Sequence, residues 1–117
     1  MMDKERQIIS ILTWGVAKYV FEKTGKDSFS AADLQKIYTV TKSDVYNYIE
    51  MNGVPEGAYH SRPSLKDGMY LIETPNGYEV YYQERGCKLD SKFFNDKKKA
   101  MKYLIDDKIY HSSVQLK

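Results

Sequence analysis

The hydrophobic pattern of this sequence changes its period once, close to residue 53, and this change restricts the fold more than any other feature. Before it, apolar residues recur at the three- and four-residue spacings of amphipathic helices. After it, runs rich in β-branched and aromatic residues flank an Asn76-Gly77 dipeptide, which is a strong short-range signal for a β-hairpin. Helices followed by adjacent strands are typical of the α+β class, so we expect an α+β fold.

The first half of the sequence predicts three helices. One runs over residues 3–24, with Trp14 on its inner flank. A short helix follows, with Ser30 as its N-cap, and a third begins after either Thr41 or Ser43. Hydroxyl side chains favour these cap positions because they accept hydrogen bonds from the free backbone N–H groups of the first turn.

The second half predicts a small antiparallel β-meander and a closing helix. Strands are expected at residues 68–74 and 78–85, and the pattern allows a third, short strand at 92–94. The helix starts near residue 96, ends near Ile109 and packs on one face of the sheet. From residue 111 onward the sequence shows no pattern, so this tail is expected to fray.

Three small residues are expected to have structural roles. Gly77 lies in the turn of the hairpin, and Gly86 follows the second strand, where positive φ or a bulge is predicted. Ala100 lies on the inward side of the closing helix. Each position suits a residue with little or no side chain.

Length and composition favour one folded domain. A chain of 117 residues has room for a single core. Its 42% hydrophobic and 29% charged residues match folded globular proteins, which argues against disorder. We therefore expect a single domain over residues 1–117, with a helical part through 53, a sheet-and-helix part over 54–110 and a tail over 111–117.

The sequence points to the cytoplasm. It contains no apolar run of the ~18 to 20 residues that a membrane span requires. The start of the chain carries charges of both signs and lacks the pattern of a secretory signal. Cys87 is the single cysteine, so the chain cannot form an internal disulfide.

No catalytic constellation can be assembled from these residues. His60 and His111 are far apart in the sequence and are expected to be solvated. Cys87 lies between Arg85 and Lys88, whose charges could activate a thiol, but a small half-buried side chain is the simpler interpretation. Zinc needs about four ligands in paired spacing, which this set does not provide. We expect no enzymatic activity, cofactor, metal or small-molecule substrate.

Nucleic-acid binding is the main alternative class. Helices over residues 31–52 followed by a hairpin at 69–85 have the order of a winged helix. The helix that would read DNA carries one cation and two carboxylates, a poor set for phosphate contacts, and the net charge of the chain is only +2. The lysine run at 97–99 is typical of a solvated helix face. We therefore keep a DNA-binding protein as the alternative to a protein-binding one.

Several motifs over residues 52–108 resemble a family of bacterial immunity proteins. They are Asn-Gly-Val-Pro-Glu-Gly-Ala-Tyr at 52–59, Asp-Gly-Met-Tyr-Leu-Ile-Glu at 67–73, the second strand ending in Glu-Arg-Gly at 84–86, the Phe pair at 93–94, and a helix with Ala100. The resemblance covers about half of the chain, and the Glu-Arg-Gly element is its most specific part. Such proteins are encoded beside polymorphic or contact-dependent growth-inhibition toxins. The resemblance implies a cytoplasmic inhibitor of one cognate toxin domain, which in such systems is often a nuclease.

The second strand supplies the expected partner-binding residues. Alternation places Glu79, Tyr81, Gln83 and Arg85 on the face that a single helix would leave open. With Glu73 they form a mixed aromatic, amide and charged stripe of the kind found at specific interfaces. We expect truncation of Tyr81 or Arg85 to reduce toxin affinity more than stability. The alternative is that Arg85 pairs with Glu73 or Glu79 as part of the framework.

Overall fold

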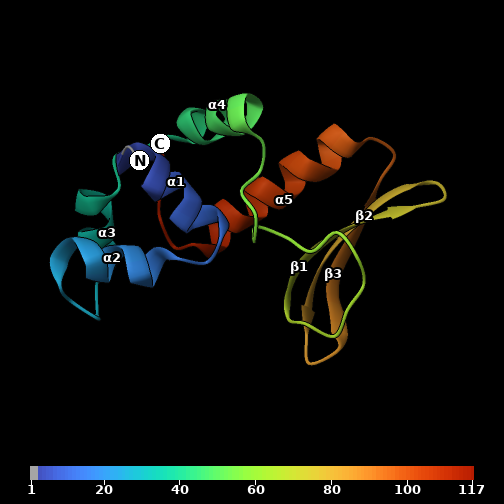
Figure 1. Cartoon of the computed structure of the whole chain (residues 1–117), viewed down its shortest axis with the longest axis horizontal. Helices are drawn as coiled ribbons and strands as arrows, with labels where there is room; N and C mark the ends of the chain where they lie inside the picture. The colour runs from blue at the N-terminus through green and yellow to red at the C-terminus, as the bar shows by residue number, and fades with distance from the viewer. Residues whose placement is uncertain (1–2) are drawn as a thin grey trace. The chain divides into compact units, whose positions relative to one another are not determined.

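The computed structural model of the chain describes residues 3–117 and confirms the α+β class. Within these residues, helices come first, a three-stranded antiparallel meander follows, and a final helix contacts the sheet (Figure 1). The helices are α1 (Asp3–Leu12), α2 (Val16–Thr24), α3 (Ala31–Ile37), α4 (Lys42–Asn52) and α5 (Lys97–His111). The strands are β1 (Gly68–Thr74), β2 (Gly77–Glu84) and β3 (Cys87–Phe94).

The chain forms two compact units. The first runs through Glu56 and also contains Lys108–Lys117, and the second is Gly57–Asp107. From the sequence we expected the helical part to end at residue 53 and the second part to continue to 110. The structure instead assigns the last turn of α5 and the tail to the helical unit.

The expectation of a single helix over residues 3–24 is wrong, because the chain forms two helices there. Trp14 adopts φ of 59°, a left-handed conformation that an α-helix cannot continue through, and the N–H of Gly15 bonds to the carbonyl of Ser10 at 2.8 Å. The expectation for the Trp14 side chain is also wrong, since 49% of it is exposed. Its ring lies 4.6 Å from the Lys108 ammonium, a cation–π distance.

Capping boxes start α3 and α4. Ser30 Oγ accepts from the N–H of Asp33, whose carboxylate accepts from the N–H of Ser30. Thr41 and Asp44 repeat this arrangement, so Thr41, and not Ser43, is the cap of α4. The backbone N–H groups of Ser30 and Thr41 hold the pKa values of the Asp33 and Asp44 carboxyls below their usual range.

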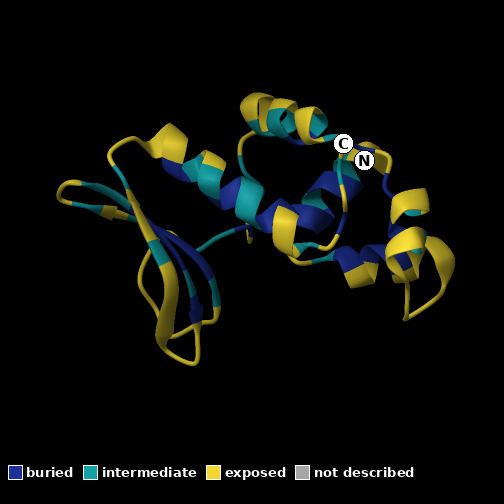
Figure 2. Cartoon of the chain, turned by 180° about the vertical axis from the view of Figure 1, so that it is seen from behind, coloured by how far each residue is buried: buried dark blue, intermediate teal, exposed yellow. Residues whose placement is uncertain are grey.

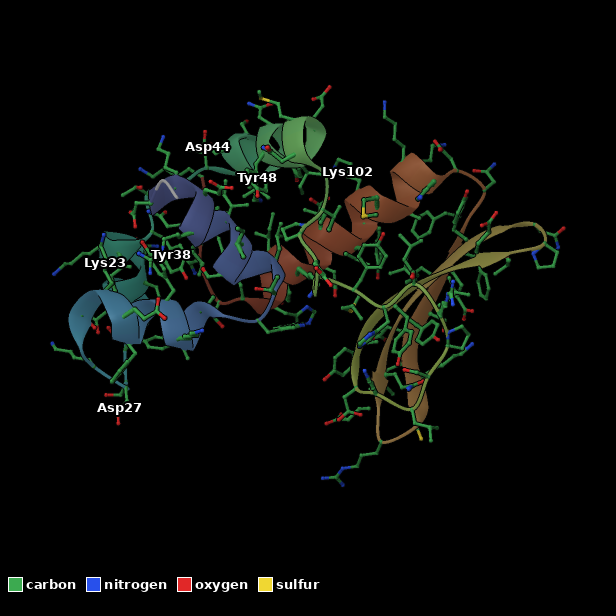
Figure 3. The ribbon with its side chains drawn as sticks, in the orientation of Figure 1. Lys23, Asp27, Tyr38, Asp44, Tyr48 and Lys102 are labelled. Atoms are coloured by element: carbon green, nitrogen blue, oxygen red, sulfur yellow. The ribbon has the colours of Figure 1, made fainter. Side chains whose placement is uncertain are left out.

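Buried polar side chains connect the helices of the first unit. Gln7 Oε1 accepts from the backbone N–H groups of Thr39 and Val40, at 2.9 and 3.2 Å. The hydroxyls of Ser10 and Tyr38 lie 2.6 Å apart. These bonds join α1 to the segment between α3 and α4. Tyr38, which follows α3, is labelled in Figure 3.

The same unit has an apolar core. Figure 2 shows dark blue, buried residues along α1 and α2. The core contains Ile8, Ile11, Leu12, Val16, Tyr19, Val20, Leu34, Tyr38, Val40 and Val45. The tail that was expected to fray contributes to this unit as well. Val114 is buried, Gln115 bonds to Gln35, and the carbonyl of Lys117 accepts from the N–H of Lys42 at 2.9 Å.

The hairpin between β1 and β2 explains the glycine at position 77. Thr74 pairs with Gly77, so Pro75 and Asn76 form a two-residue turn. Gly77 has φ of 152°, and a Cβ at this position would overlap the backbone carbonyl oxygen of Phe94. The close approach of the β3 backbone therefore requires glycine.

The turn between β2 and β3 confirms the prediction for Gly86. Arg85 and Gly86 have φ of 50° and 78°, and positive φ at both central residues is what a type I′ hairpin turn requires. β3 begins at Cys87 and is longer than the strand expected at residues 92–94. A bulge around Asp90, with φ of 53°, shifts the register opposite Val80 and Tyr82 and interrupts the alternation in the sequence.

The closing helix contacts the sheet as expected. The rings of Phe94 on β3 and Tyr103 on α5 lie 5.4 Å apart. Ala100 is fully buried, in agreement with the small residue predicted there. None of the helices within residues 3–117 has the length and apolar character needed to cross a membrane.

Candidate functional site

The face of β2 that was expected to be open is buried. Tyr81 pairs with Tyr70 and Glu79 pairs with Ile72, so the predicted alternation is present. However, only 2% of Tyr81 is exposed, and Glu79 and Gln83 are also buried. The expectation that this face is free for a partner is therefore wrong for these three side chains.

A loop formed by residues 61–67 lies over this face and is held by side chains of the sheet. Gln83 Nε2 donates to the backbone carbonyls of Ser64 and Lys66, at 2.7 and 3.0 Å. The Tyr70 hydroxyl donates to the carbonyl of Lys66 at 2.6 Å. Polar side chains on the buried face thus satisfy the backbone of the 61–67 loop where water otherwise would.

Both ends of the 61–67 loop are also attached to the sheet. At its start, His60 forms a parallel bridge with Tyr70 on the outer edge of β1, and its N–H donates to the carbonyl of Met69 at 2.8 Å. At its end, Asp67 Oδ1 accepts from the backbone N–H of Arg85 at 3.0 Å. The loop is therefore ordered at its beginning, middle and end.

A row of rings and charges runs along the same face. The Tyr70 and Tyr81 rings stack with centroids 4.9 Å apart, and the His60 ring lies 4.6 Å from Tyr70. Lys88 Nζ lies 4.6 Å from the Tyr81 ring and 3.3 Å from both carboxylate oxygens of Glu79. Burial raises the pKa of the Tyr81 hydroxyl. These contacts make Tyr81 and Glu79 part of the framework.

The expected pairing of Arg85 is not the one observed. Glu79 contacts Lys88, and Arg85 joins the framework through its backbone N–H. The expectation that Arg85 continues the second strand is also wrong, because β2 ends at Glu84 and Arg85 lies in the turn. Glu73 pairs with Tyr78 and therefore lies on the opposite face of the sheet from Glu79. Both Arg85 and Glu73 are exposed, so a direct contact of either with a partner stays a prediction.

The 61–67 loop exposes an apolar side chain between two cations. Leu65 is 90% exposed, although the carbonyls on both sides of it, those of Ser64 and Lys66, are fixed by Gln83. Arg62 and Lys66 are exposed, and among residues 3–117 no carboxylate lies within ion-pair distance of either. The sequence signal for this site was a lone leucine between basic residues in a polar loop, a pattern that hydrophobic periodicity does not detect.

The two histidines contact tyrosine rings, and the cysteine is exposed. The His60 ring packs against Tyr70 at an interplanar angle of 41°, and His111 contacts Tyr110 in the last turn of α5. Cys87 is exposed at the start of β3, so the expectation of a half-buried side chain is wrong. In the part of the chain that the structure describes, no three His, Cys, Asp or Glu side chains gather as a metal ion would require.

Comparisons of the chain with protein-family models, with curated protein sequences and with solved structures found no match.

Proposed function

We propose that this chain is an immunity protein that binds and neutralises a cognate bacterial toxin domain, of the nuclease type, through the 61–67 loop. The observation that carries the proposal is Leu65, an almost fully exposed apolar side chain on a loop whose backbone is fixed on both sides of it. The resemblance of residues 52–108 to immunity proteins supports the class of partner. In this proposal the protein acts in the cytoplasm, without catalysis or a cofactor.

The geometry suits recognition of a protein. A loop ordered before binding loses little conformational entropy when a partner docks, so more of the contact energy appears as affinity. Burial of a leucine side chain contributes about 1.5 to 3 kcal/mol. Arg62 and Lys66 on either side favour an apolar socket with a carboxylate rim. Gln83, Tyr70 and Asp67 act as positioning residues for this contact.

A titration of the toxin domain encoded beside this chain tests the proposal. We expect Leu65→Ala to raise the dissociation constant about thirtyfold or more, which corresponds to ~2 kcal/mol. Its free energy of unfolding should change by less than ~0.5 kcal/mol, because an exposed side chain loses little packing. Met51→Ala is the matched control, since Met51 is 84% exposed in the helical unit and should leave affinity unchanged.

Two outcomes would reject parts of the proposal. If Leu65→Ala binds the toxin domain as tightly as the parent protein, the 61–67 loop is not part of the interface. If the parent protein neither binds nor inhibits the toxin, the immunity function itself is wrong. Duplex DNA serves as the second titrant for the winged-helix alternative. Binding to DNA that weakens ~10³-fold or more between about 50 and 200 mM salt would favour that alternative.

A further inference from the structure

The outer edge of β3 is an open strand edge. The sheet order is β1-β2-β3, and His60 already occupies part of the outer edge of β1. Within residues 3–117, no segment pairs with the outer edge of β3. Figure 2 shows most of β3 in yellow, as exposed, beside the buried β1 and β2. An edge of this kind presents backbone N–H and C=O groups that another extended chain can pair with.

An exposed aromatic side chain lies near the end of this edge. Phe93 is 72% exposed on β3. A groove of about 430 Å³ on the β2 side of Phe93 is lined by Thr74, Asn76, Tyr78, Phe93, Phe94 and Asn95. An apolar side chain of a segment that runs along the outer edge of β3 can pack against the exposed Phe93 ring.

Lysines outnumber acids on β3 and in the residues that follow it. The exposed acids there are Asp90 and Asp96. Lys92, Lys97, Lys98 and Lys99 are all exposed. Among the described residues 3–117, none of them has a carboxylate within ion-pair distance. Asp96, the acid nearest to the run in sequence, accepts a hydrogen bond from the backbone N–H of Lys98. Over residues 87–99 lysines outnumber acids five to two, so the complementary partner is acidic.

We propose that the outer edge of β3 accepts an extended acidic segment of a protein partner as a fourth strand, with one apolar side chain of that segment against the exposed Phe93 ring. Strand addition satisfies the backbone groups of the edge, and side chains of the segment give specificity. A nucleic acid would neutralise the lysines but would leave the backbone of the edge unpaired. This inference involves a different surface from the 61–67 loop and does not depend on the toxin.

Peptide titrations of the isotope-labelled full chain, followed by the backbone amide signals, test the inference. The probe is a peptide of about nine residues with alternating Glu and Val and a central Phe, and its Lys-for-Glu counterpart is the control. We expect the acidic peptide to shift the β3 amide signals and to protect them from hydrogen exchange. Lys92→Glu should weaken binding about tenfold. Lys42→Glu on α4, an exposed lysine of the other unit, should leave binding unchanged.

Three results would overturn the inference. The lysine peptide could bind as well as the acidic one, which would remove the charge argument. A thymidine oligonucleotide of about twelve nucleotides could shift the same β3 signals more strongly, which would identify a nucleic-acid surface. Concentration-dependent protection of β3 in the free protein would identify a second copy of this chain as the occupant. None of these results affects the Leu65 titration, so the two proposals fail separately.

Discussion

Buried polar side chains occur in both compact units, and they contact different kinds of partner. In the helical unit, Gln7 accepts from the backbone of the segment between α3 and α4, and Ser10 bonds to Tyr38. In the sheet unit, Gln83 and Tyr70 donate to carbonyls of the 61–67 loop. The first network joins helices to one another. The second attaches an exposed loop to a sheet.

The difference shows that the same chemistry can serve stability or presentation. Gln7 holds a segment in which Val40 and Tyr38 are buried, so its bonds close a core. Gln83 holds a segment in which Leu65 is exposed, so its bonds order a surface. The 61–67 loop covers the sheet face that carries Tyr81 and presents the Leu65 side chain to solvent.

The largest effect is expected from the core of the sheet unit. Tyr81→Ala should lower the free energy of unfolding of this unit by about 3 to 5 kcal/mol, because it removes a buried ring that stacks on Tyr70. This replaces the expectation from the sequence that the substitution would mainly reduce affinity. Hydrogen exchange of the β1, β2 and β3 amides measures the effect. Tyr110→Ala is the control, since Tyr110 is largely exposed. A loss for Tyr81→Ala no larger than the control's would contradict the buried stack.

The helical unit should respond less strongly to the loss of its polar link. Gln7→Ala leaves the backbone N–H groups of Thr39 and Val40 without their acceptor. We therefore expect the free energy of unfolding to fall by about 2 kcal/mol. Fluorescence of Trp14, the single tryptophan, follows unfolding of this unit in denaturant. Gln35→Ala removes an exposed amide pair with Gln115 and should cost less than ~0.5 kcal/mol. Equal losses in the two variants would show that burial of Gln7 has no energetic consequence.

The smallest effect concerns pH. The Tyr19 hydroxyl, with Gln7 and Lys23, lowers the pKa of Asp3 from 3.8 to about 2. A lowered pKa stabilises the fold above the unfolded value, so this contribution is lost as pH falls from about 4 to about 2. Burial and the bond to Asp3 raise the pKa of Tyr19 from 10.0 to about 12. Its contribution is present below pH 10 and is lost as pH rises toward 12.

Asp3→Asn tests both pH windows with Trp14 fluorescence as the readout. The variant should take up about one proton fewer than the parent when it unfolds in acid. Its alkaline transition should begin at lower pH, because the carboxylate no longer opposes ionisation of Tyr19. Identical acid and alkaline profiles for the two proteins would show that the Asp3–Tyr19 bond does not contribute to stability.

Features that depend on neighbouring residues were predictable from the sequence. Ser30 and Thr41 begin helices because their hydroxyls reach backbone N–H groups three residues away. Gly86 takes positive φ because a two-residue hairpin turn requires it. The alternation along β2 was also correct, since it follows from the geometry of any strand.

Other features depended on contacts between distant residues. The buried tail has no local signal, because it is held by bonds to Lys42 and Gln35. The break between α1 and α2 does have one, since Gly15 interrupts the helical pattern directly after Trp14. The first half of β3 was not predicted, because the bulge at Asp90 interrupts the alternation of side chains between the two faces of the strand.

The amino-acid sequence by itself determined the α+β class, the Ser30 cap, the β1–β2 hairpin and the pair of faces on β2, because these follow from interactions over a few residues. Only the tertiary structure decided which face of β2 is covered. The 61–67 loop has no apolar pattern that would predict its position on the sheet. It is held there by hydrogen bonds that Gln83 and Tyr70 donate to its backbone carbonyls, and these two residues are 13 apart in sequence. Bonds of this kind form between residues that only the fold brings together, so a sequence pattern does not predict them. Because the loop covers Tyr81 and exposes Leu65, the candidate contact residue is Leu65 and not Tyr81.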